Sequence, residues 1–219
     1  AAKKLAADYG IFAKGYECGI RNEQRIIDIF KDIDSTGRTV STVILCAADL
    51  GYGTDPAKGL DFFTQDVAEF QQVFETNLVW NFMLVRQAAL RMKENGGGAV
   101  VFLSSNTAYR AIPNRMAYCA SKGGILAYTK NVAMRVAPYG ATCNSIDPGG
   151  VFTPLNDCVV NDPVLWQQIM DQTPLKRWAS AEDIAQWAYF MTVTNTFCTG
   201  QCIVIDGGES INSHFVWPK

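Results

Sequence analysis

A tyrosine and a lysine, Tyr118 and Lys122, stand four residues apart. On a helix this spacing places both side chains on one face, with Cβ atoms about 5 to 6 Å apart. A tyrosine that acts as a base near neutral pH needs its pKa lowered from about 10 by roughly three units, or about 4 kcal/mol. One ammonium group at about 4 Å supplies about that much in a medium with a dielectric constant of about 20. The pair can therefore carry acid–base chemistry, although both residue types are also common on ordinary helix surfaces.

Two further groups of polar residues follow apolar segments that have the pattern of strands. Ser104 and Ser105 end a segment that begins at Ala99, and Ser105 lies thirteen residues before Tyr118. The run Asp-Pro-Gly-Gly-Val-Phe-Thr, residues 147–153, follows the next such segment. Open parallel sheets bind ligands at the carboxyl ends of their strands. Alone, each residue could simply end a strand or cap a turn, but together they predict one site.

Helical and strand patterns alternate along the rest of the chain, and these elements must position the site. Helices are predicted over 1–9, 22–35, 64–93, 117–137, 162–170 and 181–193, and strands over 11–17, 40–48, 99–104, 142–146 and 201–205. Gly10 is placed to end the first helix, and Asn22 and Thr64 to cap the next two. The nearly unbroken apolar run 43–48 is typical of a parallel strand covered on both faces. The alternation predicts an α/β fold with a doubly wound parallel, Rossmann-like sheet, in one domain over residues 1–219.

Composition excludes several classes of protein. The 219 residues are 48% apolar and 18% charged, and the net charge of −2 comes without the basic stripe that a nucleic-acid-binding surface needs. The longest apolar run, 98–103, is too short to span a membrane, and no leader peptide is visible. Seven cysteines form no CxxC pair, so we expect reduced thiols, no metal site and a cytoplasmic location.

Read together, the motifs resemble the short-chain dehydrogenase/reductase family over nearly the whole chain. The stretches that carry the resemblance are 17–20, 75–78, 101–105, 117–124, 144–149 and 203–208. The resemblance implies that Tyr118 is the general acid/base and that Lys122 lowers its pKa and holds the nicotinamide ribose. It also implies that Ser105 binds the substrate oxygen and that Asn77 positions a water molecule that relays protons from Lys122.

The same resemblance implies an NAD or NADP cofactor, without deciding between them. Besides Tyr118 and Lys122, the residues expected to bind it are Ala47, Ala48, Pro148, Gly149, Val151 and Thr153. Of these, the Val151 backbone and the Thr153 hydroxyl would hold the carboxamide and so decide which face of the ring presents hydride. The reaction implied is the interconversion of a secondary alcohol and a ketone, on a sugar, polyol or sugar acid.

On the substrate side, Arg110 and Arg115 precede Tyr118 and can grip a carboxylate or phosphate through two hydrogen bonds. Asn114, Trp166 and Arg177 are further candidates for this side. A solvated loop is the commoner explanation for such arginines. The segment 49–64 either borders the substrate entrance or is a surface insertion, and we expect a surface or interface role for the single histidine, His214.

The sequence departs from the family at the nucleotide side. No glycine-rich turn follows a first strand near Ala1, and two strand–helix units of roughly 45 residues are missing. We therefore expect a longer polypeptide that extends upstream. Leu45 to Ala48 and Gly19 also differ from the family's usual residues, which places the adenosine half of the site in doubt.

Two alternatives to a dehydrogenase remain: a non-catalytic protein that keeps the fold for binding or assembly, and an epimerase or dehydratase that uses the same residues. Gly123 and Gly124 lie inside a predicted helix, where each glycine costs about 1 kcal/mol, so close approach of a second helix is expected. That helix belongs either to a second subunit, giving a homodimer or homotetramer, or to the same chain.

Overall fold

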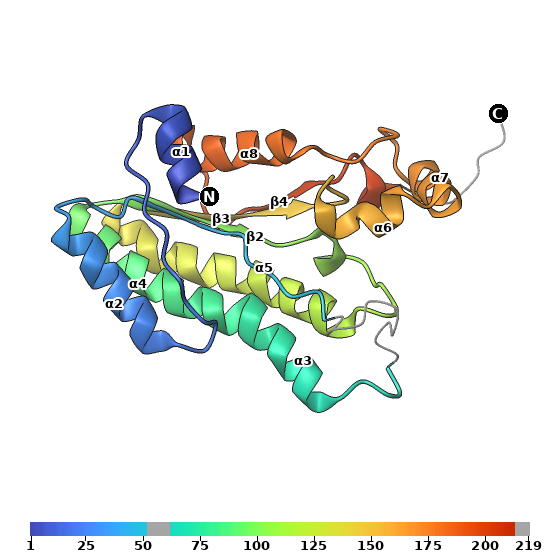
Figure 1. Cartoon of the computed structure of the whole chain (residues 1–219), viewed down its shortest axis with the longest axis horizontal. Coiled ribbons are helices and arrows are strands. Elements are labelled where there is room, and N and C mark those ends of the chain that lie inside the picture. Colours follow the sequence, from blue (N-terminus) through green and yellow to red (C-terminus); the bar gives the residue numbers. More distant parts are fainter. Residues whose placement is uncertain (52–61, 213–219) are drawn as a thin grey trace.

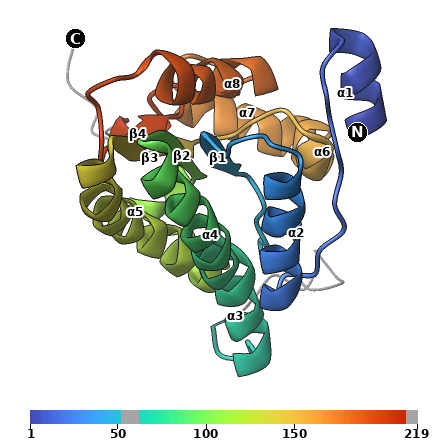
Figure 2. The same ribbon diagram turned by 90° about the vertical axis from the view of Figure 1, so that its left-hand side faces the viewer.

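The computed structural model describes residues 1–51 and 62–212 and contains a parallel sheet in the order β1-β2-β3-β4. The strands are β1 (Thr42–Leu45), β2 (Gly98–Leu103), β3 (Ala141–Pro148) and β4 (Cys202–Ile205). Helices cover both faces: α4 and α5 lie on one face and α8 on the other (Figures 1 and 2). The predicted doubly wound α/β architecture is therefore confirmed.

Eight α-helices are present in the described part of the chain. They are α1 (Ala2–Tyr9), α2 (Glu23–Ser35), α3 (Val67–Phe74), α4 (Trp80–Asn95), α5 (Met116–Val136), α6 (Asp157–Val160), α7 (Pro163–Gln172) and α8 (Ala181–Tyr189). Two π-helical turns, Glu75–Val79 and Phe190–Thr194, join α3 to α4 and extend α8. Short 3₁₀ turns occur at Asn106–Ala108, Ala137–Tyr139, Pro154–Asn156 and Glu209–Ile211.

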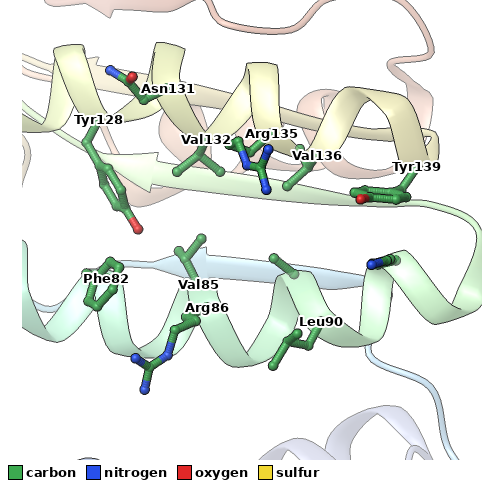
Figure 3. A pocket seen from close by; sticks show the side chains of 12 residues that line it. Phe82, Val85, Arg86, Leu90, Tyr128, Asn131, Val132, Arg135, Val136 and Tyr139 are labelled. Atoms are coloured by element: carbon green, nitrogen blue, oxygen red, sulfur yellow. The ribbon is translucent and has the colours of Figure 1, made fainter.

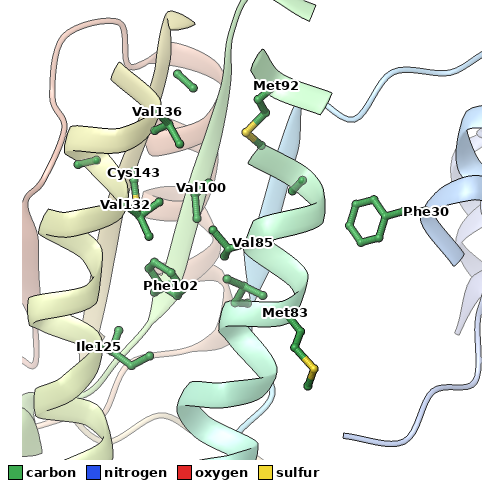
Figure 4. Close-up of a cluster of buried hydrophobic side chains, with 14 of the residues drawn as sticks. Phe30, Met83, Val85, Met92, Val100, Phe102, Ile125, Val132, Val136 and Cys143 are labelled. Carbon is green, nitrogen blue, oxygen red and sulfur yellow. The ribbon is translucent and has the colours of Figure 1, made fainter. Parts of the chain in front are cut away.

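The main hydrophobic core lies between the sheet and the α4–α5 layer (Figure 4). Val100 and Phe102 of β2 and Cys143 of β3 contribute to it from the sheet, and Val85 and Ile125 from the helices. A smaller cluster on the opposite face is built on Val101, Ile146 and Met191. Because neighbouring strand residues point to opposite faces, the continuous apolar run of β2 supplies both clusters.

Short polar side chains set the helix boundaries. The Asn22 side chain accepts a hydrogen bond from the Arg25 amide, as its predicted capping role requires. Gly10 adopts φ 63° and ends α1, also as predicted. Thr64 was expected to cap the third helix, but Asp66 does so by accepting from the Ala68 amide. A carboxylate two residues later thus moved the boundary.

Two predictions about the first part of the chain are wrong. Residues 11–17 form no strand, and Lys14 and Tyr16 instead bond to Asp32 of α2. The strand 40–48 shortens to β1, in which Thr42 and Ile44 are exposed. Within the described residues β1 pairs with β2 alone, so one of its edges has no neighbouring strand to cover and order it.

Candidate functional site

Tyr118 and Lys122 lie on one face of α5, as their spacing predicts. The Lys122 Nζ atom is 5.5 Å from the centroid of the Tyr118 ring. Lys122 is only 3% exposed, and its ammonium group donates a hydrogen bond of 2.7 Å to the carbonyl oxygen of Leu103, at the end of β2. The helix thereby delivers both side chains to the carboxyl end of the sheet.

Burial dominates the titration of both groups. It lowers the pKa of Lys122 from 10.5 to about 8, against the opposing negative charge of Asp147. Burial also raises the pKa of Tyr118, and a hydrogen bond with Ser105 and the charge of Arg115 act in the opposite direction. The cation expected to lower the Tyr118 pKa was Lys122; here Arg115 has that effect, and Lys122 is bound to Leu103.

The two serines after β2 have different partners. The Ser105 Oγ atom accepts hydrogen bonds from the Thr107 amide and hydroxyl at 3.2 and 3.0 Å, and Ser105 acts to lower the pKa of Tyr118. The Ser104 hydroxyl instead donates to the Lys122 carbonyl oxygen at 3.0 Å. Ser105 therefore faces Tyr118, while Ser104 attaches the end of β2 to α5.

Asn77 is fully buried in the π-helical turn between α3 and α4. Its Oδ1 atom accepts from the Asp49 amide at 2.7 Å, and its Nδ2 atom donates to the Asp49 carbonyl and to Ser121 Oγ, both at 2.9 Å. The side chain thus links the segment after β1 to α5, one residue from Lys122. π-helical turns of this kind frequently accompany functional sites.

The loop after β3 is held in shape by close packing. Val151 pairs with Ala179, and Nδ2 of the Asn156 side chain donates to the Val151 carbonyl at 2.9 Å and to the Thr153 hydroxyl at 3.4 Å. A Cβ atom on Gly150 would lie 2.0 Å from the Trp178 indole nitrogen. Any larger residue at position 150 would require the loop backbone or the indole to move, so the packing of Gly150 against Trp178 constrains the loop conformation.

The remaining residues predicted to bind the cofactor also lie at the carboxyl end of the sheet. Pro148 is the last residue of β3 and pairs with Ile205 of β4. A Cβ atom on Gly149 would lie 2.6 Å from Asp206 Cβ. Ala47 and Ala48 follow β1 and are exposed. The residues predicted to bind the cofactor, in segments 47–48, 118–122 and 148–153, therefore all lie at the carboxyl ends of the strands, where parallel sheets bind ligands.

The two candidate arginines differ. Arg110 forms a salt bridge of 2.8 Å with Glu209, so its guanidinium is already engaged inside the protein. Arg115 is the residue before α5, and burial lowers its pKa while the neighbouring Tyr118 acts to raise it. Of these two arginines, Arg115 is the one whose charge acts on Tyr118.

The other candidates have structural partners or lie outside the described residues. Arg177 pairs with Asp183 at 2.7 Å, and the Trp166 ring lies 5.6 Å from that of Phe152. Asn114 is exposed in the loop before α5. His214 and most of the 49–64 segment lie outside the described residues.

Asp147 begins the run 147–153 that the sequence places in the site, but the sequence predicts no role for its side chain. It is fully buried on β3 and accepts hydrogen bonds from the Tyr109 hydroxyl at 2.6 Å and the Ser145 hydroxyl at 2.7 Å. The signal in the sequence was an aspartate directly after a predicted buried strand, where an acidic side chain needs hydrogen-bond donors or a cation. A buried charge needs specific partners, and here it has them.

A groove of ≈ 390 Å³ lies away from these residues, between α4 and α5 (Figure 3). Its walls include Phe82, Val85, Leu90, Tyr128 and Tyr139. Within residues 1–51 and 62–212, no cluster of three or more histidine, cysteine or acidic side chains could hold a metal ion. Across the same residues, every helix is too short or too polar to cross a membrane.

Known proteins resemble this chain in both sequence and fold. The family model described as enoyl-(acyl carrier protein) reductase matches residues 1–210. Glucose and ribitol dehydrogenase homolog 2 of Arabidopsis thaliana is 29% identical over 194 residues, which cover 88% of this chain and 63% of that protein. The chain thus spans less than two thirds of that relative.

Two solved structures superpose on nearly the whole chain. One is 7α-hydroxysteroid dehydrogenase in complex with NADH and 7-oxo-glycochenodeoxycholic acid, with a TM-score of 0.83 and 25% identity over 94% of this chain and 79% of that one. The other is gluconate 5-dehydrogenase of Burkholderia cenocepacia with NADP and tartrate, with a TM-score of 0.87 and 21% identity over 97% and 80%. Given the matching family model and the fold, the chain belongs to the short-chain dehydrogenase/reductase family.

Proposed function

We propose that the protein is an NAD(P)-dependent oxidoreductase that interconverts a secondary alcohol and a ketone. The observation that carries this proposal is the grouping of three side chains at the carboxyl end of the sheet. The Lys122 ammonium lies 5.5 Å from the Tyr118 ring, and the Ser105 hydroxyl acts to lower the pKa of Tyr118. A tyrosine with a serine hydroxyl and a cation beside it can donate or accept a proton at a substrate oxygen.

In this proposal the three groups share the work at one oxygen atom of the substrate. The Tyr118 hydroxyl protonates the carbonyl oxygen in reduction and removes the hydroxyl proton in oxidation. The Ser105 hydroxyl hydrogen-bonds the same oxygen, where negative charge develops. Lys122 supplies positive charge from a buried position, where the field of a charge is little screened. Asn77 fixes the segment that lies beside Ser121 and Lys122.

The residues at this edge of the sheet fit the nicotinamide half of NAD or NADP. The buried Lys122 ammonium would bind the ribose, and the shaped loop with Val151 and Thr153 would hold the carboxamide. Pro148, Gly149, Ala47 and Ala48 would line the same half. When bound, the nicotinamide ring supplies or accepts the hydride. The solved relatives are complexes with NADH and with NADP, so the proposal includes both cofactors.

The proposed substrate is a sugar, polyol or sugar acid. The names of the relatives support this class, since one is a glucose and ribitol dehydrogenase homolog and another a gluconate 5-dehydrogenase. Arg115 beside Tyr118 gives the site a cation for an acid group of the substrate. Arg110 is a weaker candidate, because Glu209 already neutralises it.

We further propose that the protein is a cytoplasmic homo-oligomer. Its cysteines in the described residues are all free thiols, which suits a reducing compartment. A Cβ atom on Gly123 would meet nothing within 4 Å, so packing within the chain gives no reason for this glycine. Gly124 lines an apolar hollow with Leu78, Val79, Phe82 and Tyr128 that a second copy could fill.

Absorbance of NADH and NADPH tests the proposed reaction. The purified chain is assayed with a panel of sugars, polyols, sugar acids and their ketones, and stoichiometric production or consumption of NAD(P)H is expected. Turnover of a substrate without net NAD(P)H change would identify an epimerase or dehydratase instead. Binding without any turnover would favour the non-catalytic alternative.

The Tyr118→Phe variant tests the assigned acid/base. We expect kcat to fall by at least about 10²-fold, because the phenolic proton is lost while the ring remains. Tyr189→Phe is the matched control, since Tyr189 is an exposed tyrosine on α8. Equal kcat values for Tyr118→Phe and Tyr189→Phe would rule out the proposed mechanism.

A further inference from the structure

Asp147 combines complete burial with two hydroxyl donors. The Tyr109 hydroxyl donates to its Oδ2 atom at 2.6 Å, and the Ser145 hydroxyl donates to its Oδ1 atom at 2.7 Å. Acceptance of two short hydrogen bonds favours the ionised carboxylate. Burial raises the pKa of Asp147, whereas both hydroxyl groups and the charge of Lys122 lower it. The carboxylate therefore depends on its neighbours to keep its charge.

The Lys122 ammonium is held at the end of β2, the strand that pairs with the strand of Asp147. Lys122 donates to the carbonyl oxygen of Leu103, which pairs in register with Ile146, the residue before Asp147. The ammonium is thus anchored at the strand end beside Asp147. Asp147 is the first of the groups that act to raise the Lys122 pKa against burial, and Cys46 is the second.

Other groups of the described residues act on this pair. From α5 the Tyr118 ring centroid lies 5.5 Å from the ammonium, and Cys202 of β4 interacts electrostatically with Asp147 and Tyr109. Asp147 is completely buried and Lys122 is only 3% exposed, so water screens the attraction between their charges little.

Tyr109 connects Asp147 to the segment that carries Ser105. Ser105 accepts from Thr107, and the Tyr109 amide donates to the Asn106 carbonyl at 3.1 Å, so residues 105–109 form one turn. The Tyr109 ring is 49% exposed while its hydroxyl reaches the buried carboxylate. The hydrogen bond from Tyr109 to Asp147 therefore holds the turn against β3.

We propose that Asp147 is a positioning residue for the reaction: its buried carboxylate fixes the Tyr109 hydroxyl, and with it the Ser105 turn, and its negative charge favours the charged form of Lys122. This inference rests on the proposed dehydrogenase function. Lys122 and Ser105 act on the substrate and cofactor, whereas Asp147 acts through them. Its two effects, on charge and on the turn, can be separated by mutation.

Titration of the Lys122 ε-carbon by ¹³C NMR tests the charge effect in the full chain, with the resonance identified by its loss in Lys122→Arg. In Asp147→Asn the Lys122 pKa should fall by about 1 to 3 units, since an opposite charge in close range has been removed. Asp28→Asn, which removes an exposed carboxylate on α2, is the matched control and should leave it unchanged. An unchanged Lys122 pKa in Asp147→Asn would overturn the proposal.

If Asp147→Asn does not fold, the reciprocal measurement replaces it. In Lys122→Met the ¹³C-labelled Asp147 carboxyl should titrate about 1 to 3 units higher than in the wild type, because coupling between two sites is mutual. An unshifted Asp147 pKa overturns the proposal. Both titrations need neither cofactor nor turnover. If the wild type oxidises no alcohol, the proposed function is wrong, but the coupling between Asp147 and Lys122 can still be measured.

Tyr109→Phe tests the turn, because it removes the hydroxyl anchor and keeps the Asp147 charge. We expect kcat to fall about tenfold through displacement of Ser105, with a smaller change in the Lys122 pKa than Asp147→Asn causes. In Asp147→Asn the alkaline limb of the kcat–pH profile should lie at lower pH than in the wild type, because Lys122 then deprotonates at a lower pH. Wild-type kcat and pH profile in both variants would contradict a positioning role.

Discussion

Lys122 shows how one side chain can be costly for stability and useful for chemistry. Its ammonium is removed from water, and burial lowers its pKa to about 8. A hydrogen bond to the Leu103 carbonyl and the charge of Asp147 compensate only part of that cost. The same burial leaves the positive charge little screened, which is the property that the proposed reaction uses.

The Lys122→Met variant separates these two effects. In the wild type the unfolded chain binds more protons than the folded one between pH 8 and 10.5, so stability should rise with pH across that window. Lys122→Met should lose this rise in stability. Its free energy of unfolding at pH 7 should be about 1 to 3 kcal/mol higher than that of the wild type, because no charge is buried. Urea unfolding at several pH values measures both.

In the same variant, kcat should fall by about 10²-fold or more and cofactor affinity should weaken, since the charge and the proposed ribose contact disappear together. Steady-state kinetics and fluorescence titration with NADH and NADPH give the two quantities. Unchanged kcat and affinity would exclude the double role assigned to Lys122.

Arg115 and Arg110 allow a matched comparison, because one lies beside Tyr118 and the other is paired with Glu209. Arg115→Ala should raise KM for a sugar acid about 10- to 150-fold, the equivalent of a charged hydrogen bond of about 1.5 to 3 kcal/mol. Its KM for a neutral polyol should change little. Arg110→Ala should affect both substrates similarly, and the same pattern in Arg115→Ala would argue against charge recognition.

At the scale of elements, the site depends on loops that packing forces into one shape. Residues 150–152 pair with Ala179, and Trp178 fills the space beside Gly150. Trp178 in turn packs edge-on against Trp166 at 5.1 Å and against Phe152 at 6.0 Å. The proposed nicotinamide loop is therefore attached to α7 through an aromatic cluster.

Gly150→Ala should disturb this loop. Its Cβ atom would lie 2.0 to 2.3 Å from the Trp178 ring, so either the backbone or the indole must move. Overpacking of this kind destabilises by about 1 to 3 kcal/mol, and we expect a lower Tm together with weaker NADH binding. Gly19→Ala is the control, because a Cβ atom there meets nothing within 4 Å. Equal Tm values for both variants would contradict the packing argument.

At the scale of the whole molecule, the α4–α5 layer presents apolar surface that the chain itself does not cover. The groove between these helices is ≈ 390 Å³, and Phe82 and Leu90 on α4 are 45% and 51% exposed. Exposed apolar patches of this kind commonly mark protein interfaces. A second copy packed on this layer would leave the carboxyl end of the sheet open to ligands.

Light scattering tests this interface. The wild type should have a mass of at least twice 24.1 kDa, and Leu90→Glu should shift it toward the monomer, because a carboxylate would be buried at the contact. Val164→Glu on α7 is the control, since Val164 is an exposed apolar residue elsewhere. Identical masses for wild type and Leu90→Glu would exclude this interface.

The sequence alone determined most of the helices and strands and the pairing of Tyr118 with Lys122. Helical spacing placed Tyr118 beside Lys122, apolar runs marked β2 and β3, and Asn22 and Gly10 marked helix ends. These signals are local, since each depends on residues within one or two turns or one strand. A local signal was also wrong: residues 11–17 have a strand pattern, yet in the described part of the chain they pair with no strand and contact α2.

Only the tertiary structure decided which side chains share a charge or a hydrogen bond across elements. Glu209 lies 99 residues from Arg110 and neutralises it, and Tyr109 lies 38 residues from Asp147 and binds it. No spacing rule reaches that far, because strand register and loop course decide these contacts. Burial acts in the same way: the sequence shows a lysine, and the folded protein removes it from water and lowers its pKa to about 8.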